Sequence, residues 1–302
     1  MITSLLSLYI TSVISPDLGT NNLSNIDAPT SIIQTLGTNF SNILETKSLP
    51  VKDPYHIAPL IYAEASITVD INSGATLYEK SAHKRLAIAS ITKLMTVMII
   101  LEENELDEVA TVSNNAASIG GSTMYLVAGE KITLENLIKG AMINSANDAA
   151  VTLAEHNAGT VDKFVKKMNA KADQLDLINT SFSNPIGLDD PNNYSSAHDI
   201  ATLARYVYQK QVIRTLAQTK ETTVTSTNGN FTHKLESTNE LLDSYLRIKG
   251  LKTGRTDSAG LCLVAIAEND SNNEIVTVVL DSPARFTESK ILIDWIFRAY
   301  KW

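Results

Sequence analysis

Two side chains that could act as a nucleophile and its base stand three residues apart, at Ser90 and Lys93. If a helix begins there, both project from one side of it and the lysine amine can reach the serine hydroxyl. A serine hydroxyl is a poor nucleophile until a neighbour accepts its proton, and a lysine can do so only when burial or a nearby cation lowers its pKa. The run that follows, ITKLMTVMIILEE, is apolar nearly all round and predicts a helix buried on most sides. The pair has the residue types of an active-site serine hydrolase.

The Ser-x-x-Lys spacing is weak evidence by itself. About one chance match is expected in a chain of this length, and Ser81 with Lys84 also matches. Ser81 lies in a polar stretch, whereas Ser90 directly precedes the predicted buried helix, whose terminal N–H groups and dipole could help to hold an oxyanion. The alternative for Ser90 is a helix N-cap, with Lys93 solvated on the first turn.

Two further short motifs lie downstream. Ser145 and Asn147 end the helical run GAMINSAND, but four other serines share this Ser-x-Asn spacing: Ser113, Ser226, Ser237 and Ser271. Lys252, Thr253 and Gly254 form the single Lys-Thr-Gly sequence, after a short extended segment. A lysine and a hydroxyl on an edge strand, followed by glycine, suit the docking of a carboxylate-bearing substrate close to the backbone. An ordinary turn is the alternative.

The elements that must position these residues follow from periodicity. A hairpin is predicted over 65–71 and 75–80, and a second one around the turn at 228–229. Helical spacing recurs at 134–142, 149–156, 161–175 and 197–209, the last with a capping-box-like start at Ser196 and Asp199. LCLVAIA and IVTVVL read as buried strands, and TESKILIDWIFRAYKW as an amphipathic helix. The fold class expected is α/β (α+β): an antiparallel sheet covered by helices, with a helical subdomain.

Composition excludes several classes of protein. The chain has 302 residues, 44% hydrophobic and 19% charged, which is enough for a substantial core. The formal net charge of -8, without any cluster of Lys and Arg, argues against a nucleic-acid partner. The single cysteine, Cys262, is expected to be a small buried hydrophobe. There is no HExxH, CxxC or glycine-rich phosphate loop, so no metal or organic cofactor is expected.

The sequence divides into three parts. Residues 1–15 carry no charged side chain and form a signal-like or anchor segment, although a basic n-region and a small-residue cleavage site are missing. The stretch is also shorter than the roughly 20 residues that span a bilayer, and a disordered or loosely packed tail is the alternative. Residues 16–60 read as a linker and 61–302 as the catalytic domain.

The order of the three motifs points to one family. Each motif alone is weak evidence, but 55 positions separate Ser90 from Ser145 and 107 separate Ser145 from Lys252. From about Ala63 to Trp302 the sequence resembles the low-molecular-mass penicillin-binding proteins, the serine D-alanyl-D-alanine carboxypeptidases. The segments that carry the resemblance are ASITKLMT, GGSTMYLVAGEKITLENLIKGAMINSANDAA, NTSFSNPIGLDD, YSSAHDIATLAR, GLKTGRTDSAGLCLVA and SPARFTESKILIDW. It implies a DD-peptidase/β-lactamase-like fold.

The resemblance also implies roles around the scissile bond. Ser90 matches the nucleophile and Lys93 the general base, while Ser145 would relay a proton and Asn147 would hold the substrate amide. The backbone N–H groups of Ser90 and Arg255 would form the oxyanion hole.

A second set of matching positions faces the terminal carboxylate of the substrate. Lys252 and Thr253, with Gly254 beside them, match the family's Lys-Thr-Gly. Arg285, in the segment SPARF, resembles the arginine that helps to bind that carboxylate. For Arg285 a surface ion pair is the alternative.

The activity implied is release of the last D-alanine from peptidoglycan stem peptides through an acyl-enzyme on Ser90, with β-lactams as covalent inhibitors. The runner-up is a DD-endopeptidase. A class A-like β-lactamase is disfavoured because no ExxLN occurs between Asn147 and Lys252, and a non-catalytic wall-binding module because the motifs are intact. A Ser-His-Asp site with His198 and Asp199 is weaker, since adjacent helical residues diverge by about 100 degrees.

An extracytoplasmic location is expected, secreted, periplasmic or at the cell surface. Many relatives carry a further β-rich domain and a membrane-binding helix at the C-terminus, whereas this sequence stops at Trp302. Any membrane attachment is therefore expected through the N-terminal segment.

Overall fold

The computed structural model describes residues 49–302. The predicted anchor at 1–15 and most of the predicted linker lie outside the described residues. Within that linker, β1 (Val51–Lys52) pairs antiparallel with β11 (Tyr300–Lys301). The folded body therefore takes in residues ahead of position 61, where the sequence pattern places its start.

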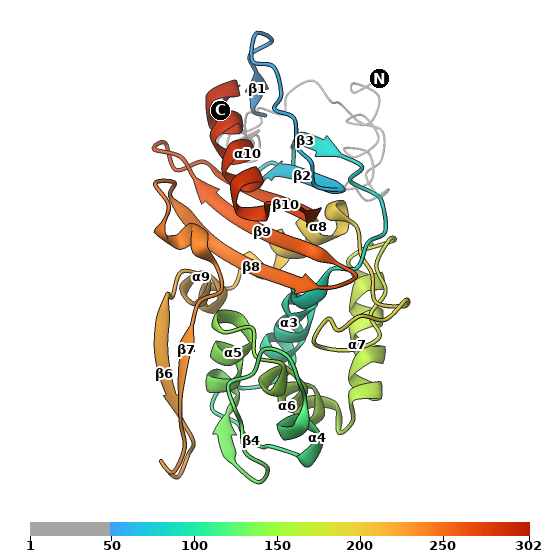
Figure 1. Ribbon diagram of the computed structural model, residues 1–302, viewed down its shortest axis with the longest axis vertical. Coiled ribbons are helices and arrows are strands. Elements are labelled where there is room, and N and C mark those ends of the chain that lie inside the picture. Colours follow the sequence, from blue (N-terminus) through green and yellow to red (C-terminus); the bar gives the residue numbers. More distant parts are fainter. Residues whose placement is uncertain (1–48) are drawn as a thin grey trace, which may run out of the picture. The chain divides into compact units, whose positions relative to one another are not determined.

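A five-stranded sheet runs through the body, with every pairing antiparallel (Figure 1). Its order is β3-β2-β10-β9-β8. The early strand β2 therefore pairs with β10, which comes from near the end of the sequence. The bounds are β2 (Ala65–Asp70), β3 (Thr76–Lys80), β8 (Ile248–Thr256), β9 (Gly260–Glu268) and β10 (Glu274–Ser282). The predicted antiparallel sheet and the hairpin at 65–80 are confirmed, and β8 lies at an edge.

Both faces of the sheet are covered, which explains why its central strands are buried along most of their length. Along β9, side chains alternate between two cores because successive residues of a strand point to opposite faces. Leu263 and Ala265 pack with α10 (Arg285–Ala299), whereas Cys262 and Val264 belong to the core shared with the other helices. Cys262 is buried as expected, and burial raises the pKa of its thiol to about 11.

The second layer is a group of helices below the sheet in Figure 1. At its centre is α3 (Lys93–Glu103), which is buried continuously from Lys93 to Ile100, as its apolar sequence predicts. Around it lie α4 (Asn114–Ser118), α5 (Leu134–Ile143), α6 (Asn147–Ala158), α7 (Val161–Gln174), α8 (Ala197–Tyr208) and α9 (Gln211–Ala217). The predicted helical subdomain is thus built around the helix that carries Lys93.

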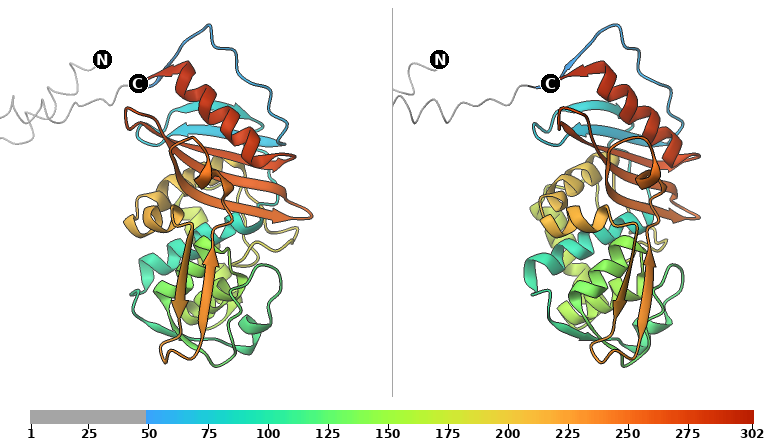
Figure 2. Two further views of the ribbon diagram at one scale, coloured as in Figure 1. Left: turned by 60° about the vertical axis from the view of Figure 1, so that its left-hand side comes forward. Right: turned by 90° about the vertical axis from the view of Figure 1, so that its left-hand side faces the viewer.

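Two small sheets flank the helices. The predicted hairpin at 228–229 forms β6 (Glu221–Thr225) and β7 (Thr232–Glu236), which stand apart from the main sheet and run along the helical subdomain (Figure 2). The pairing of β4 (Val109–Thr111) with β5 (Lys131–Thr133) is not predicted by the sequence pattern, and neither is the turn η2 (Glu240–Asp243). No helix within residues 49–302 is both long and apolar enough to cross a membrane.

The start of α8 offers a test of the predicted helix cap. The buried Ser196 hydroxyl accepts a hydrogen bond from the backbone N–H of Asp199 at 3.1 Å. Ser196→Ala is expected to lower the free energy of unfolding by about 1 kcal/mol, because it leaves that N–H without its partner. Urea denaturation of the purified protein measures the loss. Ser271→Ala, at an exposed turn, is the control and is expected to change stability by less than about 0.5 kcal/mol; equal losses would contradict the capping role.

Candidate active site

Ser90 lies in η1 (Ala89–Thr92), a 3-10 turn that leads into α3 and contacts β8 and β9. Its side chain makes no capping hydrogen bond: the N-cap residues of η1 and α3 are Ile88 and Thr92. Lys93 is fully buried, with 0% of its surface exposed. The alternative of a serine cap beside a solvated lysine is therefore wrong.

The Lys93 amine is held by three oxygen atoms. Nζ lies 2.7 Å from Ser90 Oγ, 2.7 Å from Asn147 Oδ1 and 2.9 Å from the Ile186 carbonyl oxygen. The amide and carbonyl oxygens can only accept hydrogen bonds. A neutral amine donates its two N–H groups to them, which leaves its lone pair directed at the Ser90 hydroxyl.

The surroundings of Lys93 favour that neutral form. Burial is the main reason why the pKa of Lys93 falls well below its ordinary value, and the nearby positive charge of Lys252 lowers it further, while the Asp148 carboxylate opposes both. A lysine that has lost its proton can take one from a serine. The pair has the electrostatics of a nucleophile with its general base.

Two other segments of the chain pack so closely against the backbone of the Ser90 turn that they have no room for a side chain there. Ala89 adopts a left-handed conformation, with φ of 48°, which is costly for a residue other than glycine. Gly187 has φ of 86°, and a Cβ there would overlap the Ala89 carbonyl group. A Cβ on Gly254 would lie 2.9 Å from the Ile88 carbonyl oxygen and 3.2 Å from Ser90 N. Two glycines from separate parts of the chain thus fix the turn that presents Ser90.

A second serine–lysine pair lies between the helices and the sheet. Lys252 Nζ, on β8, donates to Ser145 Oγ at 2.8 Å and to the Thr253 carbonyl oxygen at 3.1 Å. Lys252 is 1% exposed, and burial, followed by the charge of Arg285, lowers its pKa to about 7. Ser145 joins α5 to α6 in a left-handed conformation with φ of 59°. At neutral pH this amine is therefore poised between its charged and neutral forms.

Asn147 begins α6 and is fixed by two neighbours. Its Nδ2 donates to the Gly120 carbonyl oxygen at 2.8 Å, and its backbone N–H donates to the Ser122 carbonyl oxygen at 2.7 Å. Because the carbonyl oxygen of Gly120 only accepts, the amide nitrogen faces it and Oδ1 faces Lys93. Asn147 thus ties the Lys93 amine to the segment around residue 120.

The remaining predicted residues lie along and beside β8. The hydroxyls of Thr253 and Thr238 are 2.5 Å apart, and Arg285 Nη1 donates to the Gly254 carbonyl oxygen at 2.7 Å. Within residues 49–302, the buried Nε of Arg285 has no hydrogen-bond partner. The exposed Arg255 and the half-buried Arg285 line one side of a cavity of about 410 Å³. Cationic groups are thus gathered at the edge of the sheet.

The loop that faces Ser90 from the other side was not predicted from the sequence. Asn184 Oδ1 accepts hydrogen bonds from the backbone N–H groups of residues 186, 187 and 188. Thr96 Oγ1, on α3, donates to the Pro185 carbonyl oxygen at 2.6 Å. These bonds direct the Ile186 carbonyl oxygen at Lys93. The segment NTSFSNPIGLDD could have drawn attention to this loop, but a carbonyl oxygen leaves no mark in a sequence.

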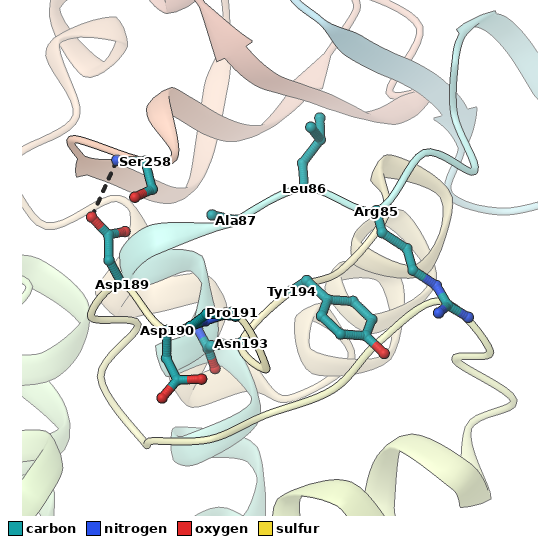
Figure 3. Close-up of a pocket in the computed structure, with 9 residues that line it drawn as sticks. All are labelled: Arg85, Leu86, Ala87, Asp189, Asp190, Pro191, Asn193, Tyr194 and Ser258. Atoms are coloured by element: carbon teal, nitrogen blue, oxygen red, sulfur yellow. Dashed lines mark hydrogen bonds between the residues drawn. The ribbon is translucent and has the colours of Figure 1, made fainter.

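Beyond this loop is a cavity of about 440 Å³ (Figure 3). Figure 3 shows Asp189 directed at Ser258, whose backbone N lies 3.1 Å from Asp189 Oδ2. Partial burial raises the pKa of the Asp189 carboxyl group, but hydrogen bonds from Thr256 and Ser258 together outweigh it, so that this pKa is lowered. The contact joins the loop after Gly187 to the turn between β8 and β9.

Two other arrangements are not formed. His198 Nδ1 lies 3.3 Å from Asp199 Oδ1, but the His198 ring stacks on His83, and the Ser90 hydroxyl is hydrogen-bonded to Lys93 instead. Among residues 49–302, no three His, Cys, Asp or Glu side chains gather in a way that would hold a metal ion.

Comparison with known proteins decides the family. A family model described as D-alanyl-D-alanine carboxypeptidase, of peptidase family S11, matches residues 53–284. The chain belongs to this family. It is 36% identical over 246 residues to D-alanyl-D-alanine carboxypeptidase DacF of Bacillus subtilis (strain 168), a match covering 79% of this chain and 63% of DacF. It is 34% identical over 280 residues to DacA of Escherichia coli (strain K12), with 88% and 68% covered.

Solved structures of related enzymes share the fold of this S11 protein. The Streptomyces K15 DD-transpeptidase superposes with a TM-score of 0.76 at 30% identity, covering 80% of this chain and 99% of that one. Penicillin-binding protein 5 from Haemophilus influenzae superposes with a TM-score of 0.74 at 34% identity, and the match covers 80% of this chain and 72% of that one. The predicted family and fold are confirmed. The match to DacF spans 63% of that protein, less than two thirds of its length.

Gly187 gives a prediction on how the Ser90 turn is held. Gly187→Ala and Gly159→Ala both place a side chain on a left-handed residue, at a cost of about 1–2 kcal/mol. At Gly159, after α6, nothing lies within 4 Å, whereas at Gly187 the methyl group meets the Ala89 carbonyl. Gly187→Ala is therefore expected to lower the unfolding free energy by clearly more than Gly159→Ala. Thermal and urea unfolding of both variants measure this; equal losses would show that the turn yields without cost.

Proposed function

We propose that the protein is a serine-type D-Ala-D-Ala carboxypeptidase that acts on peptidoglycan stem peptides. The observation that carries the proposal is the buried Lys93 amine, whose nitrogen lies 2.7 Å from Ser90 Oγ. Membership of the S11 family supports it independently. No cofactor is required, because a serine, a free amine and backbone N–H groups supply all the groups of the reaction.

In the proposed acylation, Ser90 Oγ bonds to the carbonyl carbon between the two D-alanines while its proton passes to Lys93. The carbonyl oxygen becomes an anion in the tetrahedral intermediate. Donors for it would be the backbone N–H groups of Ser90 and Arg255. The close approach of Gly254 to Ser90 N supports this role, as does the edge position of β8, which leaves alternate backbone groups free of a partner strand.

Collapse of the intermediate breaks the C–N bond, and the leaving D-alanine needs a proton on its nitrogen. Ser145 is the proposed relay: the proton that Lys93 took from Ser90 would reach this nitrogen through the Ser145 hydroxyl, which Lys252 holds by a hydrogen bond. Lys252, Thr253 and Arg285 would receive the terminal carboxylate. Water then attacks the ester carbon and gives a proton to Lys93; the bond between that carbon and Ser90 Oγ breaks, and the proton returns to Oγ. Asn147, fixed by Lys93 and Gly120, would hold the amide of the substrate.

The substrate belongs to the cell wall, so the proposal includes an extracytoplasmic location. The N-terminal segment at 1–15 would provide export or membrane attachment; it lies outside the described residues. The alternatives are a DD-endopeptidase acting on cross-links with the same residues, a class A-like β-lactamase and a non-catalytic wall-binding module.

The deciding experiment is intact-protein mass spectrometry after incubation with benzylpenicillin, for the wild type and for Ser90→Ala. The proposal predicts a penicilloyl adduct on the wild type alone. It also predicts release of D-alanine from a pentapeptide that ends in D-Ala-D-Ala. An adduct without D-alanine release would favour the endopeptidase, rapid loss of the adduct would favour the β-lactamase, and no adduct would contradict the Ser90 mechanism.

The two lysines predict how acylation depends on pH. Lys93 acts when neutral, so the acylation rate should rise with pH as this amine, with its lowered pKa, loses its proton. Lys252 attracts the carboxylate of benzylpenicillin when charged, so the rate should fall again above its pKa of about 7. A bell-shaped profile is expected from rate constants measured between about pH 5 and pH 10.

Lys252→Arg tests the assignment of the falling limb. An arginine keeps its charge throughout this range, so the decline above neutral pH should disappear even if the variant is slower. Lys249→Arg, on the same strand, is the control and should keep the wild-type profile. A falling limb that persists in Lys252→Arg would assign it to another group.

A further inference from the structure

A buried polar pair outside the site has no part in the proposed steps. His233, on β7, and Glu130, just before β5, are 6% and 3% exposed. His233 Nε2 lies 2.8 Å from Glu130 Oε1, and Nδ1 lies 2.8 Å from the carbonyl oxygen of Met124. Burying two such groups is costly unless they are hydrogen-bonded. Their contacts therefore indicate what the pair holds in place.

The contacts fix the hydrogen on one ring nitrogen of His233. The Met124 carbonyl oxygen can only accept, so Nδ1 of His233 carries a hydrogen. Nε2 and the carboxyl group of Glu130 share a second hydrogen bond, in which either group can be the donor. In either case the ring is hydrogen-bonded at each nitrogen. It therefore has a single orientation, and Met124 has a fixed distance from β7.

Both members of the pair hold one loop, residues 120–127, which we call the wall loop. His233 binds the Met124 carbonyl, and Glu130 Oε2 accepts from the backbone N–H of Val127 at 3.1 Å. From the other side, the Asp148 carboxylate accepts from the backbone N–H groups of Met124 and Leu126 at 3.1 Å and 3.0 Å. The wall loop is thus fastened between β7 and the start of α6.

The same loop orients Asn147. The carbonyl oxygens of Gly120 and Ser122 accept from the side-chain and backbone nitrogens of Asn147. A displacement of the wall loop would free the amide of Asn147 to turn, and Lys93 would lose one of its two acceptors. Figure 1 shows β7 beside the helical subdomain that contains these residues.

We propose that His233 and Glu130 form a positioning pair, which fastens the wall loop to β7 and thereby keeps the Asn147 amide oxygen on the Lys93 amine. The inference rests on the proposed function, since it concerns the rate at which Ser90 is acylated. Neither residue touches the reacting atoms.

The test measures the time course of the benzylpenicillin adduct by intact mass in full-length variants. The final amount of adduct reports the folded fraction, whereas the rate constant reports the geometry of the site. His233→Phe, which removes both hydrogen bonds, is expected to slow the rate constant by about ten-fold. His233→Gln can keep one of these hydrogen bonds, so its rate constant should lie between those of His233→Phe and the wild type. This variant replaces His233→Phe in the test if His233→Phe does not fold.

Two further variants separate positioning from general stability. Glu130→Gln can accept from Val127 and donate to His233, so its rate constant should stay within about two-fold of the wild type. Lys234→Phe makes the same substitution at the next, exposed residue of β7 and should leave the rate constant unchanged.

The outcomes are distinct. A wild type without adduct defeats the proposed function and this inference with it. If the wild type reacts, and both His233 variants form less adduct but at the rate constant of the wild type, only the positioning role is overturned. A Glu130→Gln variant as slow as His233→Phe also overturns it, because hydrogen bonds alone would not then explain the effect.

Discussion

The arrangement depends on a lysine amine kept away from water. Lys93 is fully buried at the start of the most buried helix, and its neutral form is the one that such a place favours. A buried amine still needs acceptors for its N–H groups, and the chain provides them from two distant segments, as Asn147 Oδ1 and the Ile186 carbonyl oxygen. The third neighbour is the Ser90 hydroxyl. The reactivity that we propose for Ser90 would thus follow from the packing of α3 in the core.

Several parts of the fold serve that one contact. The sheet brings Gly254 against the turn of Ser90, and the loop after α7 brings Gly187 against its other side. The helical subdomain contributes Ser145 and Asn147 from the junction of α5 with α6. A second lysine, Lys252, approaches from β8 and lowers the pKa of Lys93 by its charge. The site therefore lies where sheet and helices meet, and neither layer contains it alone.

Local patterns in the sequence predicted much of this architecture. The hairpin at 65–80, the buried helix after Ser90, the cap at Ser196 and the edge strand of Lys252 depend on short-range periodicity or on single turn residues, which a sequence displays directly. The short strands β4 and β5 were missed because three residues carry too little periodicity. The hairpin of β6 and β7 was found, but its separation from the main sheet depends on tertiary packing.

The candidate site, like the fold, could be predicted from the sequence only in part. Side chains with a recognisable motif, such as Ser90, Lys93 and Asn147, could be proposed from their type and order. What holds them could not, because Asn184 and Asp148 act on backbone N–H groups whose positions are set only by the folded chain. His233 and Glu130 lie 103 residues apart in sequence, and nothing in either segment indicates that they meet.

The carbonyl oxygen of Ile186 has a consequence for how the candidate site would look in a systematic mutational survey. Every amino acid has that oxygen, so replacing the side chain at 186 removes nothing that Lys93 uses. Ile186 is buried in the core, so a scan by alanine substitution would record the loss of its side-chain packing and would not detect that its backbone is one of the two acceptors of the buried amine. The constraint is transferred to the neighbour: Gly187 admits no side chain against Ala89. Sequence variation in this loop would thus show the importance of one residue as invariance of the next.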